Sequence, residues 1–184
     1  VSPNGVGLEA FREALLMGKS GLRYDNELEQ MGFSCCVSGR PPLKEKQLWK
    51  VIPENQRKGF NSTGIAYGLM AGLEAWSHAG FDTTTLERDP ALGIVFGCGV
   101  SSVQKTRDVA YVIDEGRVRR LRSNTVPQTM SSGIAAYLSD RLKPGNWVTT
   151  NAAACATGTE SILLASERIK SGQATKMLAG ACSD

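Results

Sequence analysis

The hydrophobic residues of the chain follow two patterns that alternate along its length. In the first, apolar residues three or four positions apart form one face of a helix, and in the second, short apolar runs are bounded by glycine or proline. Helical spacing occurs over residues 8–16, 62–79, 130–142 and 162–172, and strand-like runs occur over residues 31–37, 92–96, 147–150 and 176–181. Strands that alternate with helices indicate βαβ units, so we predict an α/β fold with a mostly parallel sheet.

The run at 92–96 is followed by Gly97-Cys98-Gly99, and an apolar run bounded by glycines predicts a strand buried on both faces. Glycines after a strand also occur in nucleotide-binding turns, but Ser102 stands where the dinucleotide motif has its third glycine. We therefore interpret this segment as a glycine turn at a strand end. The residues between this turn and Met130 are predicted to form a long connection.

One cysteine lies where a strand turns into a helix. Trp147-Val148-Thr149-Thr150 is aromatic and β-branched, and helical spacing begins at Ile162, which places Cys155 at the junction. A thiol beside a helix N-terminus is close to unpaired N–H groups and to the positive end of the helix dipole, which favour the nucleophilic thiolate. The same N–H groups can stabilise an oxyanion. Cysteine is also a common buried residue, so a packing role explains the spacing equally well.

Composition and charge argue against nucleic-acid binding and against insertion into a membrane. With 184 residues, 41% hydrophobic and 21% charged, the chain has the composition of one globular domain. The basic stretch Arg117-Val118-Arg119-Arg120-Leu121-Arg122 is short and lacks aromatic residues, which argues against nucleic acid and leaves a solvated loop or a docking site for an acidic protein. No apolar run approaches the roughly 20 residues of a membrane span, and no signal peptide is visible. We expect a cytoplasmic protein without membrane insertion.

The cysteines and the single histidine do not form a recognisable metal or disulfide pattern. Five cysteines, at 35, 36, 98, 155 and 182, have neither paired metal-ligand spacing nor the density of a secreted disulfide scaffold, so reduced thiols are predicted. His78 falls at the end of a predicted helix, where a cap or a solvent-facing role is more typical than a partner for a cysteine. No metal site and no cofactor are expected.

The segment Asn151-Ala152-Ala153-Ala154-Cys155-Ala156-Thr157-Gly158, followed by Ser161-Ile162, resembles the active-site segment of β-ketoacyl-acyl carrier protein synthases. In that family the cysteine carries the growing acyl chain as a thioester. Further stretches resemble the family in the same order along the chain, at residues 1–5, 18–21, 75–80, 93–99, 130–136 and 177–181. Residues 1–184 are accordingly identified as an N-terminal β-ketoacyl synthase domain, of which part is missing.

The resemblance implies the N-terminal half of a thiolase-like fold, with a mixed, mostly parallel sheet flanked by helices, incomplete without the C-terminal half. It implies a homodimer and a missing first strand at the centre of the sheet, so the isolated piece is expected to be unstable or to associate. The two histidines and the lysine of the family are expected beyond Asp184, and His78 matches none of them. Ser183 stands where the family commonly has an acidic residue.

The implied reaction is a decarboxylative condensation in fatty acid or polyketide biosynthesis. The Cys155 thiolate takes an acyl group from acyl carrier protein, and the acyl-enzyme condenses with malonyl-acyl carrier protein as carbon dioxide leaves. Val100 and Met130 match acyl-pocket positions, Met130 as a partner-subunit contribution, and core packing is the alternative for both. Two other functions remain open. One is a non-catalytic subunit of the chain-length-factor kind, usually marked by loss of the cysteine, and the other is a thiolase that uses coenzyme A.

Overall fold

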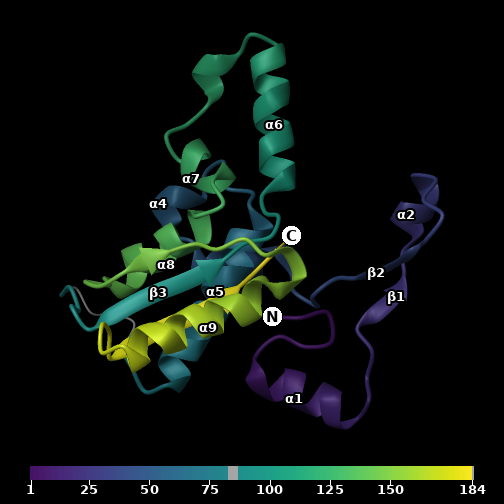
Figure 1. Ribbon diagram of the computed structural model, residues 1–184. Helices are drawn as coiled ribbons and strands as arrows, with labels where there is room; N and C mark the ends of the chain where they lie inside the picture. The colour runs from purple at the N-terminus through teal and green to yellow at the C-terminus, as the bar shows by residue number, and fades with distance from the viewer. Residues whose placement is uncertain (83–86, 184) are drawn as a thin grey trace. The chain divides into compact units, whose positions relative to one another are not determined.

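The computed structural model of the protein describes residues 1–82 and 87–183 (Figure 1). The chain forms two compact units, residues 1–48 and residues 49–184, which are described separately. The first unit carries a small two-stranded sheet, and the second carries the parallel sheet and the cysteine at the strand-to-helix junction. Only the second unit contains the candidate site residues.

The first unit contains one helix of more than two turns and an antiparallel strand pair. The predicted helix over residues 8–16 is confirmed, although most of its apolar side chains are exposed and only Ala14 is buried. The strand predicted over residues 31–37 instead begins at Val37, because Met31 and Gly32 close the preceding helix and Gly32 takes a φ of 79°. The elements of this unit are α1 (Leu8–Leu16), β1 (Leu22–Tyr24), α2 (Asn26–Gln30), β2 (Val37–Gly39) and α3 (Glu45–Leu48).

The sheet of the second unit has the order β4-β3-β5, and all of its strands are parallel. The central strand β3 (Leu92–Gly97) is buried along its whole length, as predicted from its apolar run. It pairs with β5 (Lys176–Ala181) from Leu92↔Lys176 to Gly97↔Ala181 and with β4 (Val148–Thr149) at Ile94↔Val148. Among the described residues β3 has a hydrogen-bonded neighbour on each side, and the missing first strand implied by the resemblance stays a prediction.

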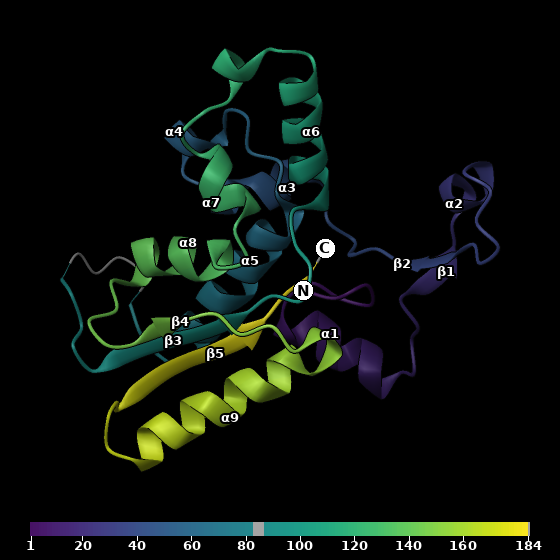
Figure 2. The same ribbon diagram turned by 45° about the horizontal axis from the view of Figure 1, so that its top comes forward.

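Helices cover both faces of this sheet (Figure 2). On one face lie α5 (Thr63–His78) and α8 (Gly133–Leu142), which approach closely because α5 has a glycine at their contact. A Cβ at Gly68 would lie 2.5 Å from Ile134 Cγ2 of α8. On the other face, α9 (Thr157–Lys170) packs on β3 and β5 through small buried side chains, namely Thr157, Ser161 and Ala165.

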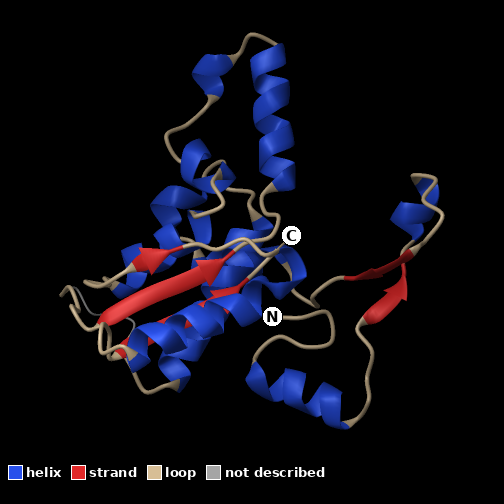
Figure 3. Cartoon of the chain, in the orientation of Figure 1, coloured by secondary structure: helices blue, strands red, loops and turns tan. Residues whose placement is uncertain are grey.

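The long connection predicted after β3 is present, but it is largely helical, which was not predicted (Figure 3). It contains α6 (Val103–Asp114), the 3-10 turn η2 (Val118–Arg120) and α7 (Thr125–Thr129). α6 is amphipathic, yet none of its residues is buried. Gly116, with a φ of 67°, follows its C-terminal end.

The remaining elements complete the second unit. The helix predicted from Met130 begins three positions later, at Gly133, because residues 130–132 form a turn in which the Gly133 N–H donates to the Met130 carbonyl. Among the helices that the structure describes, none combines the length and the apolar character needed to cross a bilayer. The elements not yet named are η1 (Trp49–Val51), α4 (Glu54–Arg57) and η3 (Ala154–Ala156).

Candidate active site

The structure places Cys155 in the 3-10 turn η3, directly before α9 and shortly after β4. The side chain is exposed, and the cysteine is a free thiol. An exposed thiol fills no packing gap, so the packing interpretation left open by the sequence does not describe this structure. We call residues 151–157 the cysteine turn.

The cysteine turn contains a backbone conformation that L-residues rarely adopt. Ala154, immediately before Cys155, has a φ of 48°, in the left-handed region that costs an ordinary residue roughly 1–2 kcal/mol. The buried Thr157 hydroxyl donates to the Ala154 carbonyl at 2.7 Å and accepts from the Ala153 N–H at 2.9 Å. These two bonds hold the unusual conformation, which is typical of backbone strain at a functional turn.

Asn151 connects the cysteine turn to the first turn of α9. Its side-chain amide donates to the Thr157 carbonyl at 3.0 Å and to the Glu160 carboxylate at 2.7 Å. Its side-chain oxygen accepts a hydrogen bond of 2.8 Å from the hydroxyl of Ser161, which is fully buried. The turn is thus bonded to the helix that follows it by a single carboxamide group.

The end of β3 lies against the base of the same turn. The Cys98 N–H donates to the Asn151 carbonyl at 3.1 Å. A Cβ at Gly97 would collide with the Thr157 methyl group and with the Asn151 side-chain oxygen, and it would lie 2.9 Å from the Asn151 carbonyl. Glycine is therefore required at position 97 because the turn approaches the strand so closely.

The backbone N–H of Cys155 is a donor without a backbone acceptor among the described residues. In the described part of the chain, the Ala156 N–H donates to the Ala153 carbonyl and the Thr157 N–H to the Ala154 carbonyl, whereas the Cys155 N–H has no backbone acceptor. An N–H group at the start of a helix that has no partner within the chain is a donor that a substrate oxygen can use.

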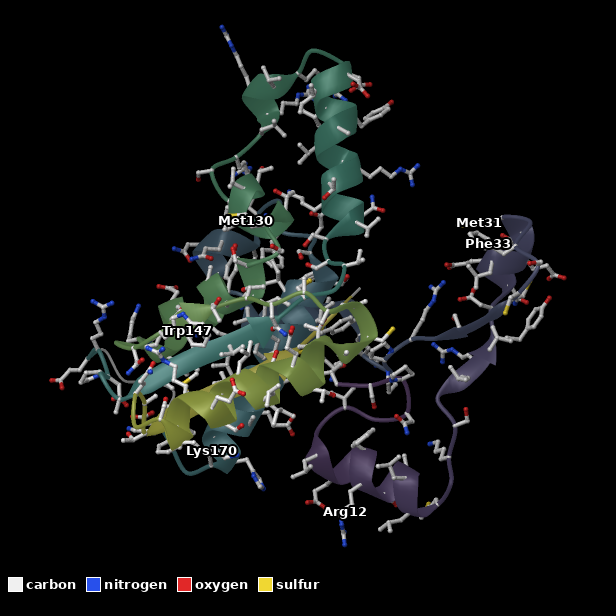
Figure 4. All side chains as sticks on the ribbon, viewed as in Figure 1. Arg12, Met31, Phe33, Met130, Trp147 and Lys170 are labelled. Atoms are coloured by element: carbon white, nitrogen blue, oxygen red, sulfur yellow. The ribbon has the colours of Figure 1, made fainter. Side chains whose placement is uncertain are left out.

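Of the two predicted acyl-pocket residues, only Val100 lies at the same end of the sheet as Cys155. It follows the glycine turn after β3, its side chain is exposed, and its N–H donates to Ser183 Oγ at 3.4 Å. Met130 follows α7 on the side of the sheet that α8 covers, opposite α9 (Figure 4). The described contacts do not bring Met130 to Cys155.

The other residues discussed from the sequence lie away from this turn or carry no site chemistry. His78 is the last residue of α5 and is exposed. Cys98 is buried, and all five cysteines are free thiols. In residues 1–82 and 87–183, no group of three or more His, Cys, Asp and Glu side chains is arranged to hold a metal ion.

No role for Asn151, Thr157 or Ser161 was predicted from the sequence. Their signal was present in the sequence as polar residues within and around a stretch of alanines. A run of alanines cannot hold its own turn by side-chain hydrogen bonds, so the hydroxyl and carboxamide groups at its ends are the natural partners for its backbone.

Comparison with models of known protein families identifies the family of this chain. The model of the β-ketoacyl synthase N-terminal domain matches residues 1–184. The 3-oxoacyl-[acyl-carrier-protein] synthase 2 of Rhizobium meliloti is 28% identical over 190 residues, a match that covers 98% of this chain and 44% of the relative. The mitochondrial 3-oxoacyl-[acyl-carrier-protein] synthase of Arabidopsis thaliana is 28% identical over 202 residues, covering 98% of this chain and 42% of the relative. The chain thus spans less than half the length of these relatives.

Solved structures share the fold. A β-ketoacyl synthase from Burkholderia phymatum superposes with a TM-score of 0.79 at 23% identity, covering 97% of this chain and 43% of that one. The ketosynthase/chain length factor of ishigamide superposes with a TM-score of 0.78 at 21% identity, covering 98% and 44%. The α/β fold expected from the sequence, that of the N-terminal part of a ketosynthase, is confirmed. The chain belongs to the β-ketoacyl synthase family and corresponds to its N-terminal domain.

Proposed function

We propose that the protein containing this chain is a condensing enzyme of fatty acid or polyketide biosynthesis in which Cys155 carries the acyl chain as a thioester. The observation that carries the proposal is the exposed Cys155 thiol in a hydrogen-bonded turn at the N-terminus of α9. Family membership adds support, since curated relatives are named 3-oxoacyl-[acyl-carrier-protein] synthases.

In the proposed reaction, the Cys155 sulfur attacks the thioester carbonyl of an acyl carrier protein. A new carbon–sulfur bond forms, the carrier thiol leaves, and the acyl group remains on the enzyme. The Cys155 N–H is the donor in this chain that supports the tetrahedral oxyanion, because it has no backbone acceptor in the described structure. The acyl-enzyme then condenses with the carbanion formed when malonyl carrier protein loses carbon dioxide. The resemblance assigns that second step to histidines and a lysine outside residues 1–184.

An acyl carrier protein is the proposed partner. One structural neighbour is a type II polyketide ketosynthase in complex with its acyl carrier protein, and this chain superposes on it with a TM-score of 0.77. The basic stretch at 117–122 is largely exposed around η2, which suits an acidic docking partner. We further propose a homodimer in the cytoplasm, with Val100 and a partner's Met130 lining the acyl pocket.

Two other functions are weighed against this one. A subunit of the chain-length-factor kind is suggested by the ishigamide ketosynthase/chain length factor among the structural neighbours. The presence of Cys155 in an exposed turn favours the catalytic subunit instead. A thiolase shares the nucleophile, but it transfers the acyl group to coenzyme A.

The test is the location of the acyl group in the full-length gene product. After incubation with acyl-loaded carrier protein, mass spectrometry of peptides is expected to find the acyl group on Cys155, and Cys155→Ala is expected to abolish it. The matched control is Cys182→Ala, at the same end of the sheet, which should retain the adduct. An acyl group that persists in Cys155→Ala would contradict the proposal. Acyl transfer to coenzyme A, without condensation with malonyl carrier protein, would identify a thiolase.

A further inference from the structure

Asn151 lies where three parts of the site meet. Its backbone carbonyl accepts from the Cys98 N–H at the end of β3, and its side chain is bonded to the first turn of α9 through Thr157, Glu160 and Ser161. Three alanines separate it from Cys155, and among the described residues its side-chain hydrogen bonds go to Thr157, Glu160 and Ser161 and not to the thiol. Any effect of Asn151 on the thiol is therefore transmitted by the turn and by the helix.

The pattern of hydrogen bonds requires a carboxamide at this position. Two donors are used, one to the Thr157 carbonyl and one to Glu160 Oε2, while the single oxygen accepts from Ser161. An ionised aspartate has the same shape but only acceptors, and leucine has neither donors nor acceptors. The two substitutions thus remove different parts of the same network.

The bond to Glu160 fixes a carboxylate within the first turn of α9. Glu160 is the acidic residue in the first turn of α9, the same helix end that Cys155 precedes. A carboxylate at a helix N-terminus interacts with the positive end of the dipole, which also favours a thiolate there. Because the Asn151 amide holds Glu160 Oε2 at 2.7 Å, the carboxylate is kept at the end of β4 and its charge is partly compensated.

We propose that Asn151 is a positioning residue for Cys155. It fixes the cysteine turn to the first turn of α9 through Thr157, Glu160 and Ser161, and it does not itself touch the substrate. The proposal rests on the proposed function, since it gives the turn the task of presenting a nucleophile.

The test measures the reactivity of Cys155 in the full-length gene product. Iodoacetamide is added at a series of pH values, and the alkylation rates of Cys155 and of Cys182 are measured by peptide mass spectrometry, with Cys182 as the internal reference. In Asn151→Leu, the ratio of the two rates is expected to fall about tenfold, because all three side-chain hydrogen bonds that fix the turn to α9 are removed. In Asn151→Asp, the rate profile of Cys155 is expected to move to higher pH, because a second carboxylate faces Glu160.

The matched control is Asn146→Leu. Asn146 precedes β4 at the opposite end, and its side chain also makes several hydrogen bonds, to Pro90, Gln173 and the Trp147 N–H. Removal of the Asn146 side chain is expected to reduce stability to a similar extent, because hydrogen bonds of the same kind are lost. The ratio of the two alkylation rates is expected to stay within about twofold of that of the unaltered protein, because Asn146 lies at the opposite end of β4. A general loosening of the fold would change both variants alike.

A rescue variant separates positioning from stability. In Asn151→Asp combined with Glu160→Gln, the amide at position 160 becomes the donor and the carboxylate at position 151 becomes the acceptor. The pH dependence of Cys155 alkylation is then expected to return toward that of the unaltered protein. If Asn151→Leu does not fold, Asn151→Asp with its rescue decides the question. A rate ratio and a pH profile unchanged in Asn151→Asp overturn the proposal. Failure of Cys155 to take an acyl group in the unaltered protein overturns the proposed function instead.

Discussion

The hydroxyl of Thr157 donates a 2.7 Å hydrogen bond to the carbonyl of Ala154, the residue that immediately precedes the candidate nucleophile. The same hydroxyl accepts from the N–H of Ala153, so one side chain closes the cysteine turn. Thr157 itself is 2% exposed, and its methyl group lies against the position that a side chain at Gly97 would occupy. The exposed Cys155 thiol thus lies in a turn that is held from below by the buried, hydrogen-bonded side chain of Thr157.

Thr157→Val is expected to destabilise the full-length protein by about 1–3 kcal/mol, because it leaves the Ala153 N–H without its acceptor and removes one of the two hydrogen bonds to the Ala154 carbonyl. Valine keeps the volume of threonine, so the loss reports the hydrogen bonds and not a cavity. Urea unfolding measures the change. The control is Thr129→Val, whose hydroxyl bonds to carbonyls of α7 nearer the surface and whose loss should cost clearly less.

Gly97→Ala is expected to reduce stability by about 1–3 kcal/mol and to slow alkylation of Cys155, because the new methyl group forces the cysteine turn away from β3. Gly99→Ala is the matched control, since its Cβ would meet Ser183 Oγ at 3.2 Å and the Ala154 Cα at 3.6 Å. Thermal unfolding and thiol alkylation are compared in the two variants. Equal effects of the two substitutions would show that the close approach at Gly97 is unimportant.

The parts of the fold that could be predicted from sequence are those where burial dictates residue type. The apolar run of β3 and the small and apolar face of α5 were recognised because packing on both sides leaves room for few other residues. Helix α6 was missed although its apolar residues recur at helical spacing, and none of its residues is buried in the described structure. The position of β2 was misjudged because the αL conformation of Gly32 ends α2 inside the predicted strand.

The candidate site divides in the same way. Cys155 could be placed from the strand and helix that flank it, since the order of elements fixes the junction. The roles of Asn151 and Thr157 depend on which backbone groups come within hydrogen-bond distance in the turn. That in turn depends on the positive φ of Ala154, which an alanine-rich sequence does not predict.

The pair formed by Asp89 and Lys176 is expected to make stability depend on pH in the acid range. Lys176 Nζ lies 2.6 Å from Asp89 Oδ2, and this hydrogen bond, with another from the Ala91 N–H, holds the pKa of Asp89 below its ordinary value of 3.8. A folded pKa below the unfolded one stabilises the fold above the unfolded value, and this contribution is lost as the pH falls through the folded value.

Lys176→Met is therefore expected to weaken the fold at neutral pH and to flatten the decline of stability below about pH 4. The measurement is urea unfolding at a series of pH values. Lys143→Met serves as the control. Lys143 pairs with Asp140, which lies one helical turn before it, at a more exposed site, and such exposed pairs contribute little to stability. An acid limb as steep in Lys176→Met as in the unaltered protein would contradict this assignment.

Charge reversal in the basic stretch is expected to weaken binding of the acyl carrier protein. Arg120→Glu should reduce the association rate about tenfold at low salt, because exposed charges act mainly on the rate of encounter. Lys170→Glu, at the C-terminal end of α9 and far along the helix from Cys155, is the charge-matched control (Figure 4). Surface plasmon resonance at two salt concentrations measures both. Equal losses in the two variants would indicate a nonspecific effect of net charge.

The hydrogen bonds described here that shape the cysteine turn join residues between 151 and 161, and the bond from the Cys98 N–H is the exception. One substitution at Asn151 or Thr157 therefore disturbs several of these bonds at once. Gly97 of β3 is the position distant in sequence to which the turn is fitted, so changes inside residues 151–161 and changes at position 97 act on the same close contact.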